Sequence, residues 1–412
     1  MYAFLNRGTV YGVIAMNESF FSSQPSPGEI EDRVEGYASW LEVDLDLLDH
    51  NLDRVREWTG VDIVPCVKSN AYGHGVVPVV AAMMRWGVRR VLVAKLWEAL
   101  QIRGAGLDCG VVSVDPLYSA RQHGEVVEEG VTQAVFSSGV AERLSREAVR
   151  QGRDAEVWVK VDTGLGRVGV RHDAAAELVA EVASMPGLEV SGVFSTLSED
   201  RELDGIQLGR LLAVGEGLRR KGVDVPCMSL ASSNAVFHFP EAYLDAVRPG
   251  LMLYGLYPEP EDRGVGLELR PVMSFKARLE QVKLVGQGES LTYSRRFVAP
   301  RRMAVGTVHA GYSDGVPRGL TGRGVVRVGG ELRRILGTVS VNHHLVDVDG
   351  LEVGAGNVVE VVSRVGENSL EGLSALAGIM PYSFCVGLNP LTPRVYLRGG
   401  RPVALSEPRL LP

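Results

Sequence analysis

The sequence contains few cysteines. There are four among 412 residues, at Cys66, Cys109, Cys227 and Cys385, and no two of them form a Cys-x-x-Cys pair. This spacing argues against the disulfide framework of a small secreted protein and against a cysteine-based zinc site. We expect four reduced thiols, most of them buried.

The chain also lacks an excess of positive charge. It has 43 Lys and Arg residues against 50 Asp and Glu residues, for a net charge of −7, and no dense basic cluster. A nucleic-acid partner is therefore not expected. No apolar run approaches the roughly 20 residues of a membrane-spanning helix. No signal-peptidase pattern follows the weakly apolar run at 10–16, so we expect a cytoplasmic protein without membrane contact.

The overall composition is that of a globular protein, with 45% hydrophobic and 23% charged residues. The length predicts two or three domains. Residues 1–38 are predicted to form a disordered N-terminal tail, because their apolar run leads into a polar stretch that contains Pro25, Ser26, Pro27 and Gly28.

Residues 47–270 are predicted to form a parallel (β/α)8 barrel of the TIM type. Short β-branched runs alternate with helical spacing, as in the stripe of Ala175, Leu178, Val179 and Val182. An open doubly wound sheet is the alternative, but no Gly-x-Gly-x-x-Gly follows the first strand. The predicted strands lie at 61–67, 91–94, 110–114, 132–136, 156–161, 190–195, 226–230 and 246–247.

The pattern changes to strict alternation at 273–280, where apolar and polar residues take turns. Further short strands separated by glycine turns predict a mostly-β C-terminal domain over residues 271–412. A strand within 39–46 precedes the barrel and is assigned to this second domain. The further strands are predicted at 303–308, 325–328, 335–339, 345–348 and 358–362.

Chemically active side chains follow the predicted barrel strands. Lys68 ends the first strand, and Arg167, Ser233 and Arg248 follow the fifth, seventh and eighth. Active sites of such barrels lie at the C-terminal ends of the strands. A lysine buried there can become a nucleophile, and hydroxyls with glycine N–H groups suit a phosphate. A strand-end lysine alone would be structural, but the combination predicts pyridoxal 5′-phosphate (PLP).

Four motifs resemble those of the alanine racemase family. The resemblance runs from about residue 40 to 396, and it implies a PLP-binding barrel followed by a β domain, acting on an amino acid in a homodimer with shared active sites. The motifs are Lys-x-Asn-Ala-Tyr-Gly-His-Gly at 68–75, Lys-x-Asp-Thr-Gly-x-Gly-Arg-x-Gly at 160–169, Arg-Pro-Gly-x-x-x-Tyr-Gly at 248–255 and Gly-Tyr-Ser-Asp-Gly-Val-Pro-Arg at 311–318.

The resemblance also implies residue roles. Lys68 would hold PLP covalently and act as one catalytic base, and Tyr312 of the partner subunit would act as the other. Arg167 would lie near the cofactor's phenolic oxygen and the substrate carboxylate, braced by Lys160, which is carbamylated in some relatives. The phosphate would be held by Tyr72, Ser233, Gly250, Leu251 and Tyr382.

Arg248 matches the arginine that faces the pyridine nitrogen of PLP in this family. A permanent positive charge there disfavours a proton on that nitrogen and so weakens the ring as an electron sink. Related barrel decarboxylases carry a carboxylate at this place. Arg248 therefore favours racemisation over decarboxylation.

Three residues depart from the family pattern. Thr196 stands where the family usually has a histidine beneath the ring, and Val341 and Asn342 replace the usual Met-Asp pair near the substrate carboxylate. Alanine remains the expected substrate, with serine or a larger amino acid as the alternative. A PLP-binding homologue without catalysis is a further alternative, which the retention of both Lys68 and Tyr312 disfavours.

His343 and His344 are neighbours on a predicted strand. Their side chains should therefore point to opposite faces and cannot bind one metal ion together. No metal site is expected.

Overall fold

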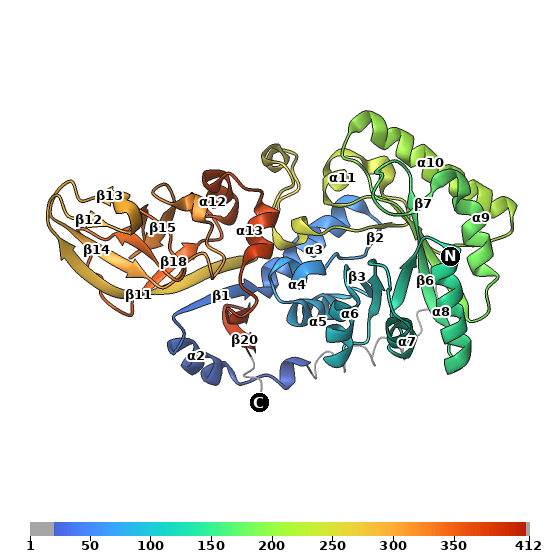
Figure 1. Ribbon diagram of the computed structural model, residues 1–412, viewed down its shortest axis with the longest axis horizontal. Coiled ribbons are helices and arrows are strands. Elements are labelled where there is room, and N and C mark those ends of the chain that lie inside the picture. The colour runs from blue at the N-terminus through green and yellow to red at the C-terminus, as the bar shows by residue number, and fades with distance from the viewer. Residues whose placement is uncertain (1–19, 409–412) are drawn as a thin grey trace.

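The computed structural model describes residues 20–408. The barrel (blue to yellow-green) lies beside an elongated, mostly-β domain (orange to red) in Figure 1. A long strand, β11 (Met273–Val285), runs through the second domain and reaches back towards the barrel.

The first domain is a closed barrel of parallel strands, which confirms the predicted (β/α)8 class. Neighbouring strands pair in the order β3-β4-β5-β6-β8-β9, and β10 pairs with β2. A bridge between Cys66 and Leu92 joins the segment after β2 to β3. The backbone N–H of Arg248, directly after β10, donates to the carbonyl of Ala231, which follows β9, at 2.9 Å. The strands are β2 (Asp62–Ile63), β3 (Arg90–Val93), β4 (Gly110–Ser113), β5 (Thr132–Val135), β6 (Ala155–Asp162), β8 (Leu188–Phe194), β9 (Met228–Ser229) and β10 (Ala246–Val247).

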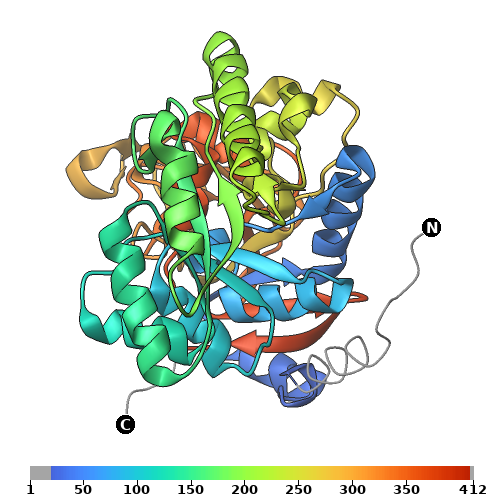
Figure 2. The same ribbon diagram turned by 90° about the vertical axis from the view of Figure 1, so that its right-hand side faces the viewer.

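Helices surround these strands, as the turned view in Figure 2 shows. The predicted apolar stripe on α9 is buried against the barrel, because residues at i, i+3, i+4 and i+7 share one helix face. A short strand, β7 (Val170–Arg171), pairs with β6. The helices are α3 (Leu45–Thr59), α5 (Val76–Trp86), α6 (Leu96–Gly104), α7 (Ala120–Glu128), α8 (Ser138–Gln151), α9 (His172–Ala183), α10 (Arg201–Arg220) and α11 (Ser233–His238).

The second domain is built on a nine-stranded sheet in the order β14-β17-β16-β15-β18-β11-β1-β19-β20. A strand that precedes the barrel, β1 (Ser39–Asp44), joins this sheet, pairing antiparallel with β11 and parallel with β19 (Arg394–Arg398). The remaining elements are β12 (Ser290–Leu291), β13 (Phe297–Val298), β14 (Met303–Val308), β15 (Val325–Val328), β16 (Glu331–Leu336), β17 (His344–Asp347), β18 (Val358–Val362), β20 (Arg401–Ser406), α12 (Leu370–Ala377) and α13 (Pro381–Gly387).

Short 3-10 helices punctuate the connections, at η1 (Pro240–Ala242), η2 (Leu251–Tyr254), η3 (Pro260–Gly264), η4 (Tyr293–Arg295) and η5 (Arg318–Leu320). Within residues 20–408 no single helix is long and apolar enough to cross a membrane. By length and composition, only α12 and α13 together would suffice, and they meet at a bend of 106°.

The expected disordered tail differs from the structure over part of its length. Residues 1–19 lie outside the described residues, but α2 (Pro27–Glu35) is a capped helix. The Ser26 and Glu29 side chains form a capping box, and Ile30 packs with Trp40 and Val395 in a small apolar cluster. The capping box and the buried Ile30 therefore order residues 27–35, which their polar composition predicts to be disordered.

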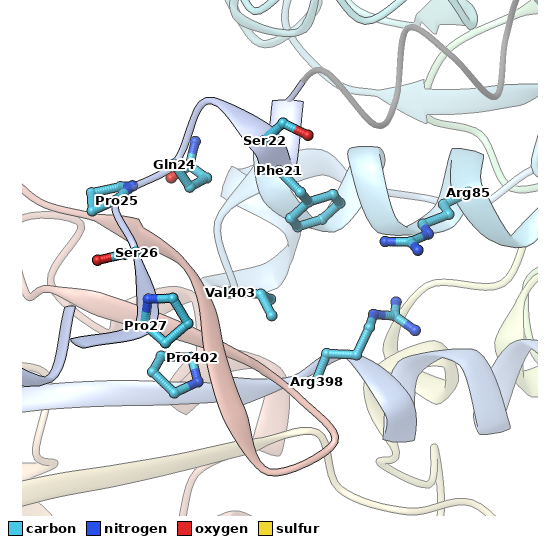
Figure 3. Close-up of a pocket in the computed structure, with 10 residues that line it drawn as sticks. All are labelled: Phe21, Ser22, Gln24, Pro25, Ser26, Pro27, Arg85, Arg398, Pro402 and Val403. Carbon is cyan, nitrogen blue, oxygen red and sulfur yellow. The ribbon is translucent and has the colours of Figure 1, made fainter. Parts of the chain in front are cut away.

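The chain before α2 also lies against the C-terminal strand. Phe21 and Gln24 line a cavity of about 400 Å³ together with Pro402 and Val403 of β20 (Figure 3). The side chains that Figure 3 draws include no carboxylate, thiol or imidazole. We assign this cavity to the docking of the N-terminal segment.

Candidate active site

A cavity of about 480 Å³ opens at the C-terminal ends of the barrel strands. It brings together side chains from loops that are far apart in the sequence, as expected for a barrel mouth. The predicted site residues that line it are Lys68, Tyr72, Lys160, Arg167, Thr196, Ser233, Arg248, Gly250 and Tyr382.

Lys68 begins a tight left-handed turn, α4 (Lys68–Tyr72). Ser69 to Tyr72 all have positive φ, between 51° and 57°, which is rare for residues other than glycine. Buried Glu98 supports the turn, because its Oε1 accepts a hydrogen bond from the backbone N–H of Asn70 at 3.2 Å and its Oε2 caps the start of α6. Sequence reasoning did not single out Glu98. Its partner Asn70 lies 28 positions away, a separation that no short motif reveals.

The glycines of this motif allow the C-terminal part of the chain to approach. A Cβ on Gly73 would lie 2.2 Å from the carbonyl oxygen of Cys385, and one on Gly75 would lie 1.8 Å from the hydroxyl of Tyr396. Both glycines also have positive φ. His74 between them is buried and stacks on Tyr254 at 4.3 Å, and burial lowers its pKa to about 3. His74 is therefore a neutral, structural side chain at physiological pH.

Hydroxyl groups and glycine backbone gather at one side of the cavity. The backbone N–H of Gly250 donates to Oγ of Ser233 at 2.9 Å, and a Cβ on Gly250 would lie 2.5 Å from the hydroxyl of Tyr72. Burial holds the pKa of Tyr72 well above its ordinary value of 10, so the phenol stays a donor. Leu251 is buried and begins η2 directly after this corner, so only its backbone can contribute to an anion site.

Arg248 is a buried cation with a fixed orientation. Its Nη1 donates to Oγ of Ser229 at 2.5 Å, and its Nη2 donates to the carbonyl of Ser195. The guanidinium also lies 5.1 Å from the ring centroid of Phe194. Burial lowers its pKa to about 10, which still leaves the group charged at neutral pH.

Lys160 on β6 is buried beside Arg248. Its Nζ donates to Oγ1 of Thr196 at 3.0 Å. Burial first, and then the positive charges of Arg248 and Arg167, lower its pKa to about 7. The amine is therefore half neutral near physiological pH, and Thr196 provides its hydrogen-bond acceptor.

The charges around this cavity suit an anionic ligand. Among residues 20–408, the basic side chains that line it are Lys68, Lys160, Arg167 and Arg248, and the carboxylates are Asp115 and Glu199. Sequence reasoning did not name either acid. The donor set fits PLP: an amine for the aldehyde, hydroxyls and a glycine N–H for the phosphate, and guanidinium groups for the phenolic oxygen and the ring nitrogen. The space beside Gly250, which a Cβ would fill, supplies the close backbone approach that a phosphate needs.

Tyr312, Val341 and Asn342 lie elsewhere, on the β domain. Tyr312 and Val341 are 45% and 47% exposed, and Asn342 Nδ2 donates to Oγ of Ser313 at 3.0 Å. The backbone N–H of Tyr312 donates to the carbonyl of Ser340 at 3.0 Å, which ties the two loops together. The structure thus brings these predicted residues together in a second cluster, apart from Lys68 of the same chain.

Comparison with known proteins places both domains. The chain matches the sequence models "Alanine racemase, N-terminal domain" over residues 43–258 and "Alanine racemase, C-terminal domain" over residues 272–396. It is 36% identical to the alanine racemase of Desulforamulus reducens over 87% of this chain and 98% of that protein. With the alanine racemase of Geobacter sulfurreducens it shares 33% identity over 86% of this chain and 96% of the relative.

Solved structures agree with this assignment. The crystal structure of alanine racemase from a D-cycloserine-producing Streptomyces lavendulae superposes with a TM-score of 0.82 at 31% identity, covering 88% of this chain and 97% of that one. The alanine racemase from Streptomyces coelicolor gives a TM-score of 0.81 at 29% identity, covering 87% and 98%. Together with the cavity around Lys68, these matches show that the chain belongs to the alanine racemase family, whose members are PLP-dependent isomerases.

Proposed function

We propose that this protein interconverts L- and D-alanine with PLP, using Lys68 and the Tyr312 of a partner subunit as its two bases. The proposal rests on the cavity at the barrel mouth, which is lined by Lys68, Arg167 and Arg248 together. Each of the three is placed by a different barrel loop, so the fold itself assembles an amine and two guanidiniums around one ligand.

Residues of this chain would hold the cofactor as the donor set suggests. Lys68 would bind its aldehyde carbon, while Tyr72, Ser233, Tyr382 and the backbone at 250–251 would hold its phosphate. When bound, PLP withdraws electron density from the α-carbon of the amino acid and makes its α-proton acidic. Arg248 would lie at the ring nitrogen and, being charged at neutral pH, would donate there without delivering a proton.

The remaining steps are binding and proton movement by the protein. Arg167 would orient the substrate carboxylate, with Val341 of the partner beside it. The Lys68 amine would remove or return the α-proton on one face, and the Tyr312 phenol would do so on the other. Two bases on opposite faces are what inversion at carbon requires.

A shared site follows from where Tyr312 lies. Its ring is exposed on the β domain, and Arg318 lies 6.0 Å from the ring centroid as a positive neighbour. Because Lys68 sits in the barrel of the same chain and Tyr312 does not line that cavity, we propose a head-to-tail homodimer in which each β domain covers the partner's barrel. We also assign the enzyme to the cytoplasm, which agrees with four free cysteines.

The cofactor assignment can be tested by chemical trapping. Borohydride reduction of the PLP-loaded protein, followed by digestion and mass spectrometry, should place the cofactor on the peptide that contains Lys68. Lys160, which lines the same cavity, is the internal control. Recovery of the label on Lys160 would contradict the assignment.

The shared site can be tested by mixing inactive variants. Lys68→Ala and Tyr312→Phe chains, each inactive alone, should regain activity after mixing and refolding, because a heterodimer contains one complete site. A mixture that stays inactive while native mass spectrometry shows heterodimers would refute the shared site. Proton exchange at the α-carbon of L-alanine in heavy water, together with loss of optical rotation, measures the reaction itself.

A further inference from the structure

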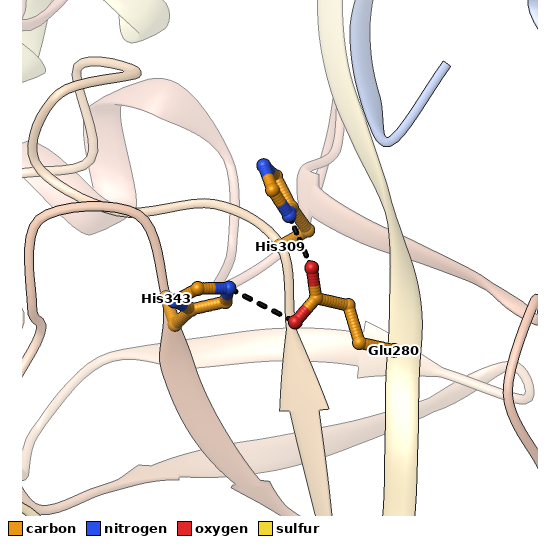
Figure 4. Close-up of side chains that lie close together, drawn as sticks. All are labelled: Glu280, His309 and His343. Carbon is orange, nitrogen blue, oxygen red and sulfur yellow. Dashed lines mark hydrogen bonds and ion pairs between the residues drawn. The ribbon is translucent and has the colours of Figure 1, made fainter. Parts of the chain in front are cut away.

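Three potential metal ligands meet on the β domain, away from the barrel cavity. Glu280 lies on β11, His309 follows β14, and His343 directly precedes β17. Figure 4 shows both imidazoles turned towards the carboxylate of Glu280. Oε1 of Glu280 contacts Nδ1 of His309, and Oε2 lies 2.9 Å from Nε2 of His343.

The three residues lie close enough for their ligand atoms to reach one metal ion after the side chains move together. One ligand atom from each of the three residues can be chosen so that all lie within 4.8 Å of one another. Zinc binds imidazole nitrogen and carboxylate oxygen at roughly 2.0–2.2 Å, so tetrahedral ligands stand about 3.4 Å apart. The side chains of Glu280, His309 and His343 are 42%, 31% and 40% exposed. They therefore have room to rotate until their ligand atoms stand at the spacing of zinc ligands.

The backbone fixes the positions from which these side chains extend. The pairing of β11 with β14 shifts register between Leu279 and Gln281, so Glu280 occupies an irregularity of the ladder. Bulges of this kind re-aim a side chain. The N–H of His309 donates to the carbonyl of Arg278 at 3.1 Å, and the carbonyl of His343 accepts from the N–H and the hydroxyl of Ser340 at 2.8 and 2.7 Å.

We propose that Glu280, His309 and His343 form a binding site for a divalent transition-metal ion of the zinc class. Two imidazoles and one carboxylate are a borderline ligand set that suits Zn²⁺ rather than Mg²⁺ or Ca²⁺, which prefer oxygen. Three protein ligands leave a fourth position for water. His344 takes no part, because it is buried and its Nδ1 bonds the carbonyl of Ala310 at 2.7 Å.

The site adjoins the loops that carry the second catalytic cluster. His309 is three residues before Tyr312, and His343 directly follows Asn342. The N–H of Ser313 already donates to the carbonyl of Val341 at 2.9 Å across these loops. A metal ion held by His309 and His343 would add a cross-link at the base of both loops and would restrict the motion of Tyr312. Its binding does not depend on the racemase activity.

Zinc titration of the PLP-loaded, chelator-dialysed full-length protein tests the proposal. Isothermal titration calorimetry should show one strong Zn²⁺ equivalent per chain for the wild type. Glu280→Gln and His343→Gln, which keep hydrogen-bonding capacity, should each weaken it by about tenfold or more. His172→Gln at the start of α9 is the matched control and should bind as the wild type does. Circular dichroism verifies that all variants are folded.

Two results would overturn the proposal. One is a wild type that takes up no zinc below about millimolar concentration, where incidental surface binding begins. The other is undiminished uptake by Glu280→Gln or His343→Gln, which would place the ion elsewhere. Substitution with Co²⁺ gives an independent readout, because visible absorption bands typical of tetrahedral Co²⁺ should appear in the wild type and in His172→Gln but not in the other two variants.

Discussion

Replacing Lys160 by methionine should change how the stability of the PLP-free protein depends on pH. The Lys160 side chain is buried near Arg248 and Arg167, and the pKa of its amine falls from an ordinary 10.5 to about 7. Burial is the largest cause, followed by repulsion from the two guanidiniums. Methionine has a similar length and no charge, so Lys160→Met removes this titration while largely keeping the volume.

The magnitude follows from the two pKa values of Lys160. A fall in the pKa of Lys160 from 10.5 to about 7 means that folding disfavours its charged amine by about 5 kcal/mol. This value is an upper limit. Because the unfolded chain holds the proton more tightly, it carries more protons between pH 7 and 10.5. The free energy of unfolding therefore rises with pH in that window. The destabilisation of the folded state by charged Lys160 is therefore full below pH 7 and disappears above about pH 10.5.

Between pH 7 and 8.5 the advantage of methionine over lysine should accordingly shrink by about 2 kcal/mol. Urea unfolding of both proteins at the two pH values measures this difference, and any constant offset from the lost hydrogen bond to Thr196 cancels. Lys283→Met on the exposed part of β11 is the control for replacing a lysine by methionine. A difference between wild type and Lys160→Met that stays constant from pH 7 to 8.5 would refute the reasoning.

Three further substitutions have expected outcomes. Gly250→Ala places a Cβ 2.5 Å from the hydroxyl of Tyr72 and should weaken PLP binding about tenfold or more in an absorbance titration, since the hydroxyl must move. Gly75→Ala, at φ 95° and 1.8 Å from the hydroxyl of Tyr396, should destabilise the fold by more than about 2 kcal/mol in urea unfolding. Thr196→His should raise kcat/KM for alanine about tenfold while lowering that for serine and longer substrates; if neither changes, this departure from the family is neutral.

Periodicity was sufficient to predict the barrel. Eight β-branched runs with intervening helical stripes define a parallel barrel, and parallel strands place their C-terminal ends at one rim. Lys68 and Arg248 could therefore be placed near each other, although they follow β2 and β10. The same logic located Arg167 and Ser233. Lys160 was named only through the family resemblance. A strand that ends in a polar side chain is a local sequence feature. It is sufficient here because the barrel topology brings the C-terminal ends of all its strands together.

Other features depend on contacts between distant segments. The left-handed turn at Ser69–Tyr72 is held by Glu98, and the glycines at 73 and 75 are fitted to the C-terminal chain. The Glu280, His309 and His343 cluster requires β11, the residues that flank β14 and β17, and a ladder irregularity. No short motif reports such pairings. The helix α2 is different: its Ser26-Pro-x-Glu29 capping box was readable, and only the polar composition around it hid the signal.

The same cations that suit the site for an anionic ligand also oppose folding in its absence. Arg248 is buried, and Lys160 is held where its charged form is disfavoured, with Arg167 and Lys68 adding to the repulsion. Selection for the stability of the ligand-free protein alone would replace one of these cations, but all four side chains line the cavity. An anion bound there would screen all of them at once, so binding and folding stability are coupled through one cluster of charge. Thr196 is consistent with this coupling. Its neutral hydroxyl accepts a hydrogen bond from Lys160 and, unlike a protonated histidine, adds no positive charge to the cluster.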